Sequence, residues 1–381
     1  MCRSGTSANG GMLVTGLAVA VFAASASAGV DIKVNTTSPA GSVQNEVRLA
    51  IDPGNSLNLV AAYNNQNGQV SPNSLGISYS SDGGATWGDT TLTGANNPFA
   101  PPNTPFTNIF DPAVGSAPGA GDFFAAYIGA DAGAAPGGGG GASGLFVDRS
   151  TTGGMTWTGP TLIDSNPAAT LDPQNRDPNY RFNDRVHIDL DPVSVLHATW
   201  IKDVDVGQST SDIYYNFANA AVPAGVGNTG LTFGASIIVN DGFGGTDEAN
   251  APYVSPHPNG DVWIAWIDYD VTVSNDATGR IMADRGTGGG PVTPPTFGTD
   301  ILVQNIDPLP RNVTTSNGVT DVIAKSGPVI VADGNDGTGN TAYIAYAAED
   351  PANNDQANIY FTATTDGGLN WSGPIKVNDD S

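Results

Sequence analysis

Short apolar runs recur along the chain, and clusters of Gly, Asn, Asp and Pro separate them. Each run holds about four to eight residues rich in Val, Ile and aromatic side chains, which is the pattern of a β-strand. The clusters between the runs supply the residues that tight turns require. The pattern therefore predicts an all-β protein built from many short strands.

The predicted strands fall in a fixed order that repeats five times. The innermost strands begin near Glu46, Asp111, Asp184, Ala251 and Pro328. The second strands each end in an aromatic residue and cover residues 59–63, 123–127, 196–200, 262–266 and 342–346. The third strands cover residues 75–80, 144–147, 212–217, 280–283 and 358–362, and the outermost strands cover residues 90–92, 161–163, 236–239, 300–303 and 374–377. Repeated units of four short strands predict the blades of a β-propeller.

One motif recurs between the third and the outermost strand. It reads Ser-Ser-Asp-Gly-Gly-Ala-Thr-Trp at 80–87, Ser-Thr-Thr-Gly-Gly-Met-Thr-Trp at 150–157 and Thr-Thr-Asp-Gly-Gly-Leu-Asn-Trp at 364–371. Weaker Thr-Phe-Gly traces stand at 232–234 and 296–298. The motif resembles the Asp box, S-x-D-x-G-x-T-W, of the sialidase-like (BNR repeat) β-propeller superfamily. The positions that carry the resemblance are Ser80, Asp82, Gly84, Thr86, Trp87, Ser150, Gly154, Thr156, Trp157, Thr364, Asp366, Gly368 and Trp371.

The resemblance implies a sialidase-like β-propeller of four-stranded blades over residues 29–381. It also implies that the boxes are structural turns on the face opposite any active site. Five units are visible in the sequence. Residues 30–35 (Val-Asp-Ile-Lys-Val-Asn) are similar to the fifth outermost strand. The chain is therefore expected to be either a truncated six-bladed propeller or a five-unit ring that closes irregularly.

The first 28 residues predict a secretory signal peptide. Arg3 supplies the positive start, residues 12–24 supply the apolar stretch, and Ala-Ser-Ala at 26–28 supplies a cleavage site near Ala28. We therefore expect a monomer that is secreted, periplasmic or on the cell surface, with no membrane span after cleavage. Cys2 is the single cysteine and lies in this leader, so the mature chain has no thiol chemistry.

The charge balance narrows the choice of ligand. Thirty-seven acidic residues oppose 13 Lys and Arg residues, and the net charge is −24. Such a surface repels nucleic acid, and it suits a neutral glycan, a basic protein or a hard cation. Calcium is the cation that carboxylates would bind, and the candidate ligands in the predicted loops between second and third strands are Asp203, Asp205, Asp268 and Asp270.

Residues for catalysis follow from the resemblance and not from spacing. Sialidases of this superfamily use three arginines for the substrate carboxylate, an Asp acid/base, and a Tyr nucleophile assisted by Glu. The candidates at the face opposite the boxes are Arg48, Arg185 and Arg311, with Glu248 and Tyr253 as substitutes whose spacing matches no family motif. The alternative for the arginines is that they form scattered salt bridges to a very acidic surface. Arg48 stands in Glu-Val-Arg-Leu, which departs from the Arg-Ile-Pro signature of the family.

Three functions remain open at the level of the sequence. The first is an exported module that recognises a glycan or protein ligand and has no catalytic site. The second is a glycoside hydrolase, either an exo-sialidase or a relative that acts on a neutral sugar. The third is a structural role in an outer layer. The acidity of the predicted loops disfavours an anionic sugar such as sialic acid.

Overall fold

The structure is a computed structural model that describes residues 34, 43–66, 74–92, 106, 108–118, 121–131, 142–166, 181–204, 210–221, 229–241, 247–270, 278–309, 313–314, 320–322, 327–350 and 355–379. These residues form strands and turns and no helix, and none of them forms a segment that could cross a membrane as a helix. The expected signal peptide lies outside the described residues, as does the expected strand at 30–35 apart from Val34.

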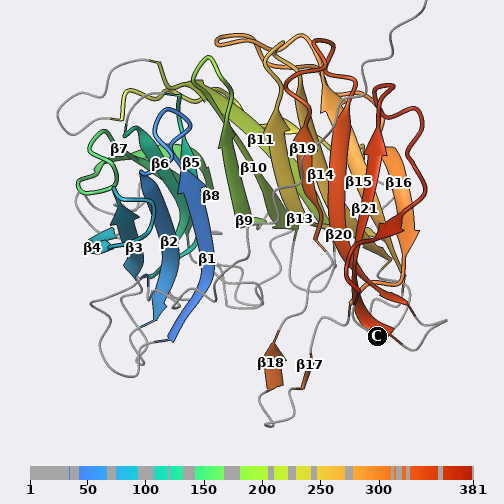
Figure 1. Ribbon diagram of the computed structural model, residues 1–381, viewed down its shortest axis with the longest axis horizontal. Helices are drawn as coiled ribbons and strands as arrows, with labels where there is room; N and C mark the ends of the chain where they lie inside the picture. Colours follow the sequence, from blue (N-terminus) through green and yellow to red (C-terminus); the bar gives the residue numbers. More distant parts are fainter. Residues whose placement is uncertain are drawn as a thin grey trace, which may run out of the picture. The chain divides into compact units, whose positions relative to one another are not determined.

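The strands form five four-stranded antiparallel sheets, each in chain order, and the strands of sheet one lie side by side in Figure 1. Sheet one contains β1 (Val43–Ile51), β2 (Leu59–Gln66), β3 (Ser74–Ser80) and β4 (Gly88–Leu92). Sheet two contains β5 (Asn108–Ser116), β6 (Phe123–Ala130), β7 (Ser143–Ser150) and β8 (Thr158–Asn166). Sheet three contains β9 (Arg181–Leu190), β10 (Val195–Val204), β11 (Thr210–Asn219) and β12 (Ile237–Ile238).

Sheet four contains β13 (Asp247–Pro256), β14 (Val262–Asp270), β15 (Gly279–Gly286) and β16 (Ile301–Ile306). Sheet five contains β19 (Val329–Ala332), β20 (Ala342–Asp350), β21 (Asp355–Thr364) and β22 (Ile375–Lys376). Between them in sequence is a small hairpin of β17 (Val313–Thr314) and β18 (Thr320–Val322), which the sequence pattern did not predict. Sheets three and four are joined by one parallel pair, Ser211 with Glu248. This repeat of antiparallel four-stranded sheets confirms the predicted blades.

The second strands are longer than predicted. They continue three or four residues past the aromatic residue at which the prediction ended them. Asp203, Asp268 and Asp270 therefore lie in β10 and β14, and the placement of these residues in loops was wrong. The reason is that main-chain hydrogen bonds extend the hairpins into polar sequence, where side-chain pattern gives no strand signal.

Sheet-on-sheet packing forms the core. The innermost strands of neighbouring sheets contact one another in the order β1, β5, β9, β13 and β19. Both faces of the inner sheets are apolar, and every residue of β6 is buried. Trp200, Trp263 and Trp266 are fully buried. Each of these indoles contributes about 2–3 kcal/mol by leaving water.

The three box motifs form tight turns between third and fourth strands. In the first, the Ser80 hydroxyl accepts a hydrogen bond from the Gly84 N–H at 2.9 Å, and Asp82 accepts one from the Thr86 N–H at 2.8 Å. The Trp87 indole donates to the Gly84 carbonyl at 3.0 Å. The hydrogen bonds from Thr86 hold the pKa of Asp82 at about 2, so the carboxylate stays ionised as a structural acceptor.

The second box keeps this geometry without an aspartate. The Thr152 hydroxyl accepts the Thr156 N–H at 2.9 Å, which is the contact that Asp82 makes in the first box. Both glycines of each pair have positive φ; those of Gly153 and Gly154 are 68° and 89°. The Gly153 N–H also donates to the carbonyl of Gly121, in the turn between the first two strands of the same sheet. A hydroxyl can therefore replace the carboxylate, whereas a side chain at these positive φ values would strain the turn.

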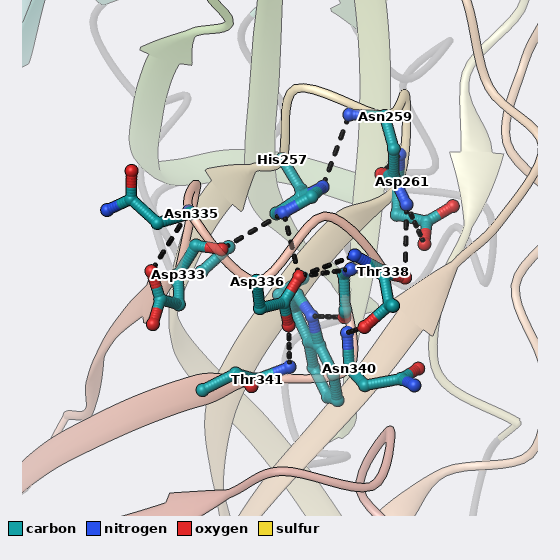
Figure 2. A network of polar contacts seen from close by, with 12 residues as sticks. His257, Asn259, Asp261, Asp333, Asn335, Asp336, Thr338, Asn340 and Thr341 are labelled. Carbon is teal, nitrogen blue, oxygen red and sulfur yellow. Dashed lines mark hydrogen bonds and ion pairs between the residues drawn. The ribbon is translucent and has the colours of Figure 1, made fainter. Parts of the chain in front are cut away.

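A polar network joins the corresponding turns of sheets four and five, as Figure 2 shows. The buried His257 lies after β13, and its Nε2 is 3.0 Å from the Asp333 carbonyl oxygen and 3.2 Å from Asp336 Oδ1. The Asp336 carboxylate accepts backbone N–H groups of Thr338 and Gly339 at 2.7 and 2.6 Å. These contacts make the run at 333–337 a hydrogen-bonded turn between β19 and β20.

The outward face of sheet five is uncovered among the described residues. Cross-strand register places ten apolar residues on it, namely Val329, Val331, Tyr343, Ala345, Ala347, Ile359, Phe361, Ala363, Ile375 and Val377. Val331 is 52% exposed, whereas Ile330 on the opposite face is fully buried against sheet four. The inner edge of sheet one similarly exposes Val47, Leu49 and Ile51. Both terminal sheets thus present apolar surface of the kind that the inner sheets bury.

This difference between the two faces gives a test in solution. We expect Val331→Asp to lower the free energy of unfolding by less than about 1 kcal/mol, and Ile330→Asp to lower it by about 3 kcal/mol or more. Denaturant unfolding of both variants measures the two values. An equal, large loss in Val331→Asp would show that the outward face of sheet five is covered in the native protein.

A buried carboxyl in sheet two gives a second test. Burial raises the pKa of Asp148 in β7 to about 7, and the Tyr127 hydroxyl donates to its Oδ2 at 2.8 Å. The carboxyl is therefore protonated in the folded chain at pH values where the unfolded chain has ionised it. Its contribution to stability is complete below about pH 4 and is lost as the pH rises through about 7.

We expect Asp148→Asn to remove this pH dependence, because the amide keeps an acceptor for Tyr127 and cannot ionise. The variant should gain stability relative to the original protein between pH 4 and 7, by on the order of 3 kcal/mol in total. Urea unfolding across this range measures the difference. A constant difference at all pH values would contradict burial of a protonated Asp148.

Candidate functional site

The innermost strands of sheets one to four share one backbone irregularity. Each has a residue in the left-handed region, followed by a shift in register against the second strand. These residues are Glu46, Asp111, Arg185 and Ala251, with φ between 49° and 56°. Non-glycine residues rarely adopt this conformation, and β-bulges re-aim side chains beside functional sites. The same strained bulge thus occurs near the start of the innermost strand in four sheets, which singles out this part of the fold as a candidate site.

The four bulges surround a cavity of about 560 Å³. All five sheets contribute to its wall, because the segment 327–329 at the start of β19 completes it. The polar lining residues are Glu46, Arg48, Asp111, Arg185 and Tyr253. The cavity lies at the starts of the innermost strands, whereas the box turns lie beyond their ends. It is therefore on the face opposite the box turns, where the sequence placed a ligand site.

Two carboxyl residues, Glu46 on β1 and Asp111 on β5, line this cavity, and Asp184 on β9 is a further carboxyl neighbour of Asp111. Burial and these two neighbours raise the pKa of Asp111 well above its usual range. Burial beside other carboxyl groups thus favours the neutral form of Asp111.

The sequence reasoning missed this cluster. The sequence pattern identified Glu46, Asp111 and Asp184 only as the positions near which innermost strands begin. The available signal was that three of the five strand starts carry an acidic residue at nearly the same repeat position. Only the convergence of the sheets shows that these three positions face one another.

Two of the predicted arginines reach the site. Arg48 is exposed at the cavity wall, and Arg185 Nε lies 3.7 Å from Asp184 Oδ2. Arg311 lies outside the described residues. The positive charges of the two described arginines at the cavity are thus offset by the nearby carboxyl groups.

Tyr253 lies on the wall and stacks on His187, with ring centroids 3.5 Å apart. Burial and the positive charge of Arg48 lower the pKa of His187 to about 3, and its Nδ1 accepts the Val254 N–H at 3.3 Å. Burial and the negative charge of Asp189 raise the pKa of Tyr253. The pair is therefore a neutral aromatic platform, and the phenol is not activated as a nucleophile.

The other predicted site residues lie elsewhere or outside the described part of the chain. Glu248 is in β13, and its side chain is outside the described part, as are the side chains of Asp203 and Asp270 and the whole of Asp205. Asp268 is buried, accepts the Trp266 indole N–H at 3.1 Å and lies 3.7 Å from Arg280. Within the described ranges no three acidic, histidine or cysteine side chains converge as a metal site.

Comparison with known proteins adds the fold relationship. No protein-family model matches the sequence, and no curated protein matches it. Among solved structures, the α-L-arabinanase of Penicillium chrysogenum in complex with arabinobiose is 14% identical with a TM-score of 0.51, over 87% of this chain and 82% of that chain. The GH93 α-L-arabinofuranosidase of Fusarium graminearum with arabinobiose is 11% identical with a TM-score of 0.53, over 89% of this chain and 82% of that chain.

The chain folds as a sialidase-like β-propeller. The identities are low, so the likeness concerns the fold and not the chemistry. In this propeller the cavity lies where the blades converge, and its residues come from the innermost strand of each blade. The blades fix the position of the site, and the residues at the four bulges decide its chemistry.

The environment of His187 leads to a direct measurement. Because its pKa is lowered to about 3, we expect its imidazole NMR signals to stay constant between about pH 4.5 and 8. Arg48→Ala should raise the pKa of His187, since a positive neighbour opposes protonation. A full titration of His187 near pH 6.5 in the original protein would show that the imidazole is exposed and that the platform is not formed.

Proposed function

We propose that the central cavity binds a glycan and hydrolyses a glycosidic bond, with Asp111 as the proton donor. The observation that carries this proposal is that Glu46 and Asp111 line one cavity, where burial and the neighbouring carboxyl groups of Asp184 and Glu46 raise the pKa of Asp111. Glycoside hydrolysis requires one carboxylic acid to protonate the leaving oxygen and one carboxylate to act as base or nucleophile. The cluster supplies both protonation states within one cavity.

The roles follow from the contacts of each carboxyl. Asp111 can give its proton to the glycosidic oxygen, and the C–O bond to the leaving group then breaks. Glu46 or Asp184 can stabilise the positive charge at the sugar carbon and either bond to it or take a proton from the attacking water. Water supplies the hydroxyl of the product, and its remaining proton restores the acid.

The charges at the cavity support a neutral sugar. Three carboxyl groups face two arginines, and Arg185 is already directed at Asp184. An anionic sugar would need positive charge that no carboxylate offsets, as the three-arginine arrangement of sialidases provides. The arabinose-containing ligands named for the two similar propellers are neutral, which is consistent with this choice. We expect the protein to act as an exported monomer, with the box turns in a purely structural role.

A second function is favoured by the aromatic platform. Tyr253 presents its ring at the wall, backed by the buried ring of His187, and an aromatic ring binds sugars or protein side chains without any chemistry. In this alternative the propeller is a recognition module for a glycan or protein ligand, and the carboxyl cluster only orients that ligand. The two functions predict different results for one variant.

Asp111→Asn separates the two functions. If Asp111 is the acid, the variant should lose about 10²–10⁴-fold in kcat/KM on fluorogenic glycosides of neutral sugars, with α-L-arabinofuranosides tested beside sialosides and hexosides. Its binding to a glycan array, with and without calcium, should persist. Asp82→Asn in the first box is the matched control and should leave the rate unchanged, since it removes a carboxylate from the opposite face.

The original protein is the reference for both outcomes. Array binding without turnover of any glycoside would support the recognition module and reject the hydrolase. Turnover that Asp111→Asn retains would remove Asp111 from the mechanism. Neither binding nor turnover would reject the glycan site altogether.

A further inference from the structure

Lys202 is a buried lysine at the interface of two blades. It lies in β10 of sheet three, and only 8% of the residue is exposed. Its Nζ forms an ion pair with Oδ2 of Asp164, which lies in β8, the outermost strand of sheet two. Lysine is rarely buried to this extent, because taking two charges out of water costs free energy that only good geometry and further hydrogen bonds offset. A buried amine and a buried carboxyl thus face each other between sheets two and three.

The two carboxyl oxygens of Asp164 have different surroundings. Oδ1 accepts a hydrogen bond from the Ser236 hydroxyl at 3.3 Å. Oδ2 is buried and has no hydrogen-bond partner among the described residues, although Lys202 Nζ lies against it. The contact therefore lacks the hydrogen-bond geometry that normally stabilises such an ion pair. The amine is placed against the carboxyl group without the interaction that would make a lasting salt bridge.

A second carboxyl residue and an aromatic surface flank the amine. Asp212 is directly opposite Lys202 in the antiparallel pair of β10 and β11, so both side chains project from the same face of sheet three. Directly opposite Cβ atoms are about 4.5–5.5 Å apart, which is within the reach of a lysine amine. The Tyr214 ring lies 4.7 Å from Nζ, and Trp200 stacks on Tyr214. A nucleophile, a carboxyl carbon and a base are thus gathered in one largely apolar place.

We propose that Lys202 and Asp164 join through an isopeptide bond between Nζ and Cγ, which links sheets two and three covalently. Asp212 serves as the base that activates the amine. The Ser236 hydroxyl, which already donates to Oδ1, stabilises the negative oxygen of the tetrahedral intermediate. Each neighbour of the ion pair therefore has a role in the reaction.

The reaction needs no oxidant, reductant or further reactant. Asp212 takes a proton from the Lys202 ammonium, and Nζ then bonds to Asp164 Cγ. Oδ1 carries the negative charge of the intermediate until the Cγ–Oδ2 bond breaks. Oδ2 leaves as water with two of the three ammonium protons, one of them delivered by Asp212, and the amide nitrogen keeps the third.

Two features of the fold favour this bond. It replaces two buried charges by a neutral amide, so the free-energy cost of burying them disappears. The packed blades also hold the amine against the carboxyl, which makes the reaction intramolecular. Cys2 is the single cysteine, so a disulfide within the chain cannot supply such a link. None of the four residues lines the central cavity, and the bond therefore does not depend on the proposed function.

Mass spectrometry of the purified protein tests the bond. Once its N-terminus has been determined, the unfolded chain should be lighter than its sequence by the mass of one water molecule. Trypsin does not cleave after an acylated lysine, so a digest should contain peptide 150–176 joined to peptide 186–280. Without the bond, the digest contains peptides 150–176, 186–202 and 203–280 separately.

Variants assign the roles. Lys202→Met keeps a long apolar side chain without the amine and should restore the full mass. Lys376→Met is the matched control, because Lys376 is the other lysine in the described part of the chain and is exposed in β22; it should retain the joined peptides. Asp212→Asn should slow the joining by about 10²-fold or more in samples taken during expression, with circular dichroism confirming the fold.

Two results in the original protein would overturn the bond. The first is the full sequence mass with the peptides recovered separately. The second is a loss of water without joined peptides, which indicates ring closure at an Asp-Gly sequence such as that at 82–83. Joining at the original rate in Asp212→Asn would overturn the role of Asp212 as base. The original protein decides the presence of the bond even where a variant does not fold.

Discussion

The five four-stranded sheets that the structure describes are apolar on both faces, and the rest of the structure depends on covering those faces. A four-stranded sheet of this kind cannot be stable alone in water. Stacking each sheet on the next stabilises the fold by about 2–3 kcal/mol for every large side chain that becomes buried. The stack brings the five innermost strands together along their edges. The same constraint explains why the turns of neighbouring sheets are locked by contacts such as that of His257 with Asp336, and why the first and last sheets expose Val47 and Val331.

The convergence of innermost strands also creates the site. An unbroken strand would alternate its side chains between the two packed faces and leave none directed at the centre. The bulge at Glu46, Asp111, Arg185 and Ala251 breaks that alternation at one level. Each bulge carries a cost in backbone strain, on the order of 1–3 kcal/mol, that the surrounding packing has to offset. The result is a small polar cavity in an otherwise apolar centre.

Within that cavity, the direction of the hydrogen bonds, rather than the net charge, determines the chemistry. Burial and the neighbouring carboxyl groups of Asp184 and Glu46 raise the pKa of Asp111 and so favour its neutral form. Donors face the other two carboxyl groups: the amide of Asn64 donates to Glu46, and the backbone N–H of Arg185 donates to Asp184. The box turns show the same principle in a structural role, since Thr152 replaces an aspartate by supplying an equivalent acceptor. Hydrogen-bond direction is thus conserved between repeats where residue identity is not.

The sequence by itself determined the class of fold, the five-fold repeat, the strand order and the position of the box turns. These features are local, because alternation, paired glycines and turn residues act over a few neighbours along the chain. It also led to Arg48, Arg185 and Tyr253, which line the cavity on the face opposite the box turns. Only the tertiary structure brought Glu46, Asp111 and Asp184 together, because they lie on different blades and their contact depends on how the sheets pack. It also moved Asp268 from a loop into a buried strand, since main-chain pairing continues where the side-chain pattern ends.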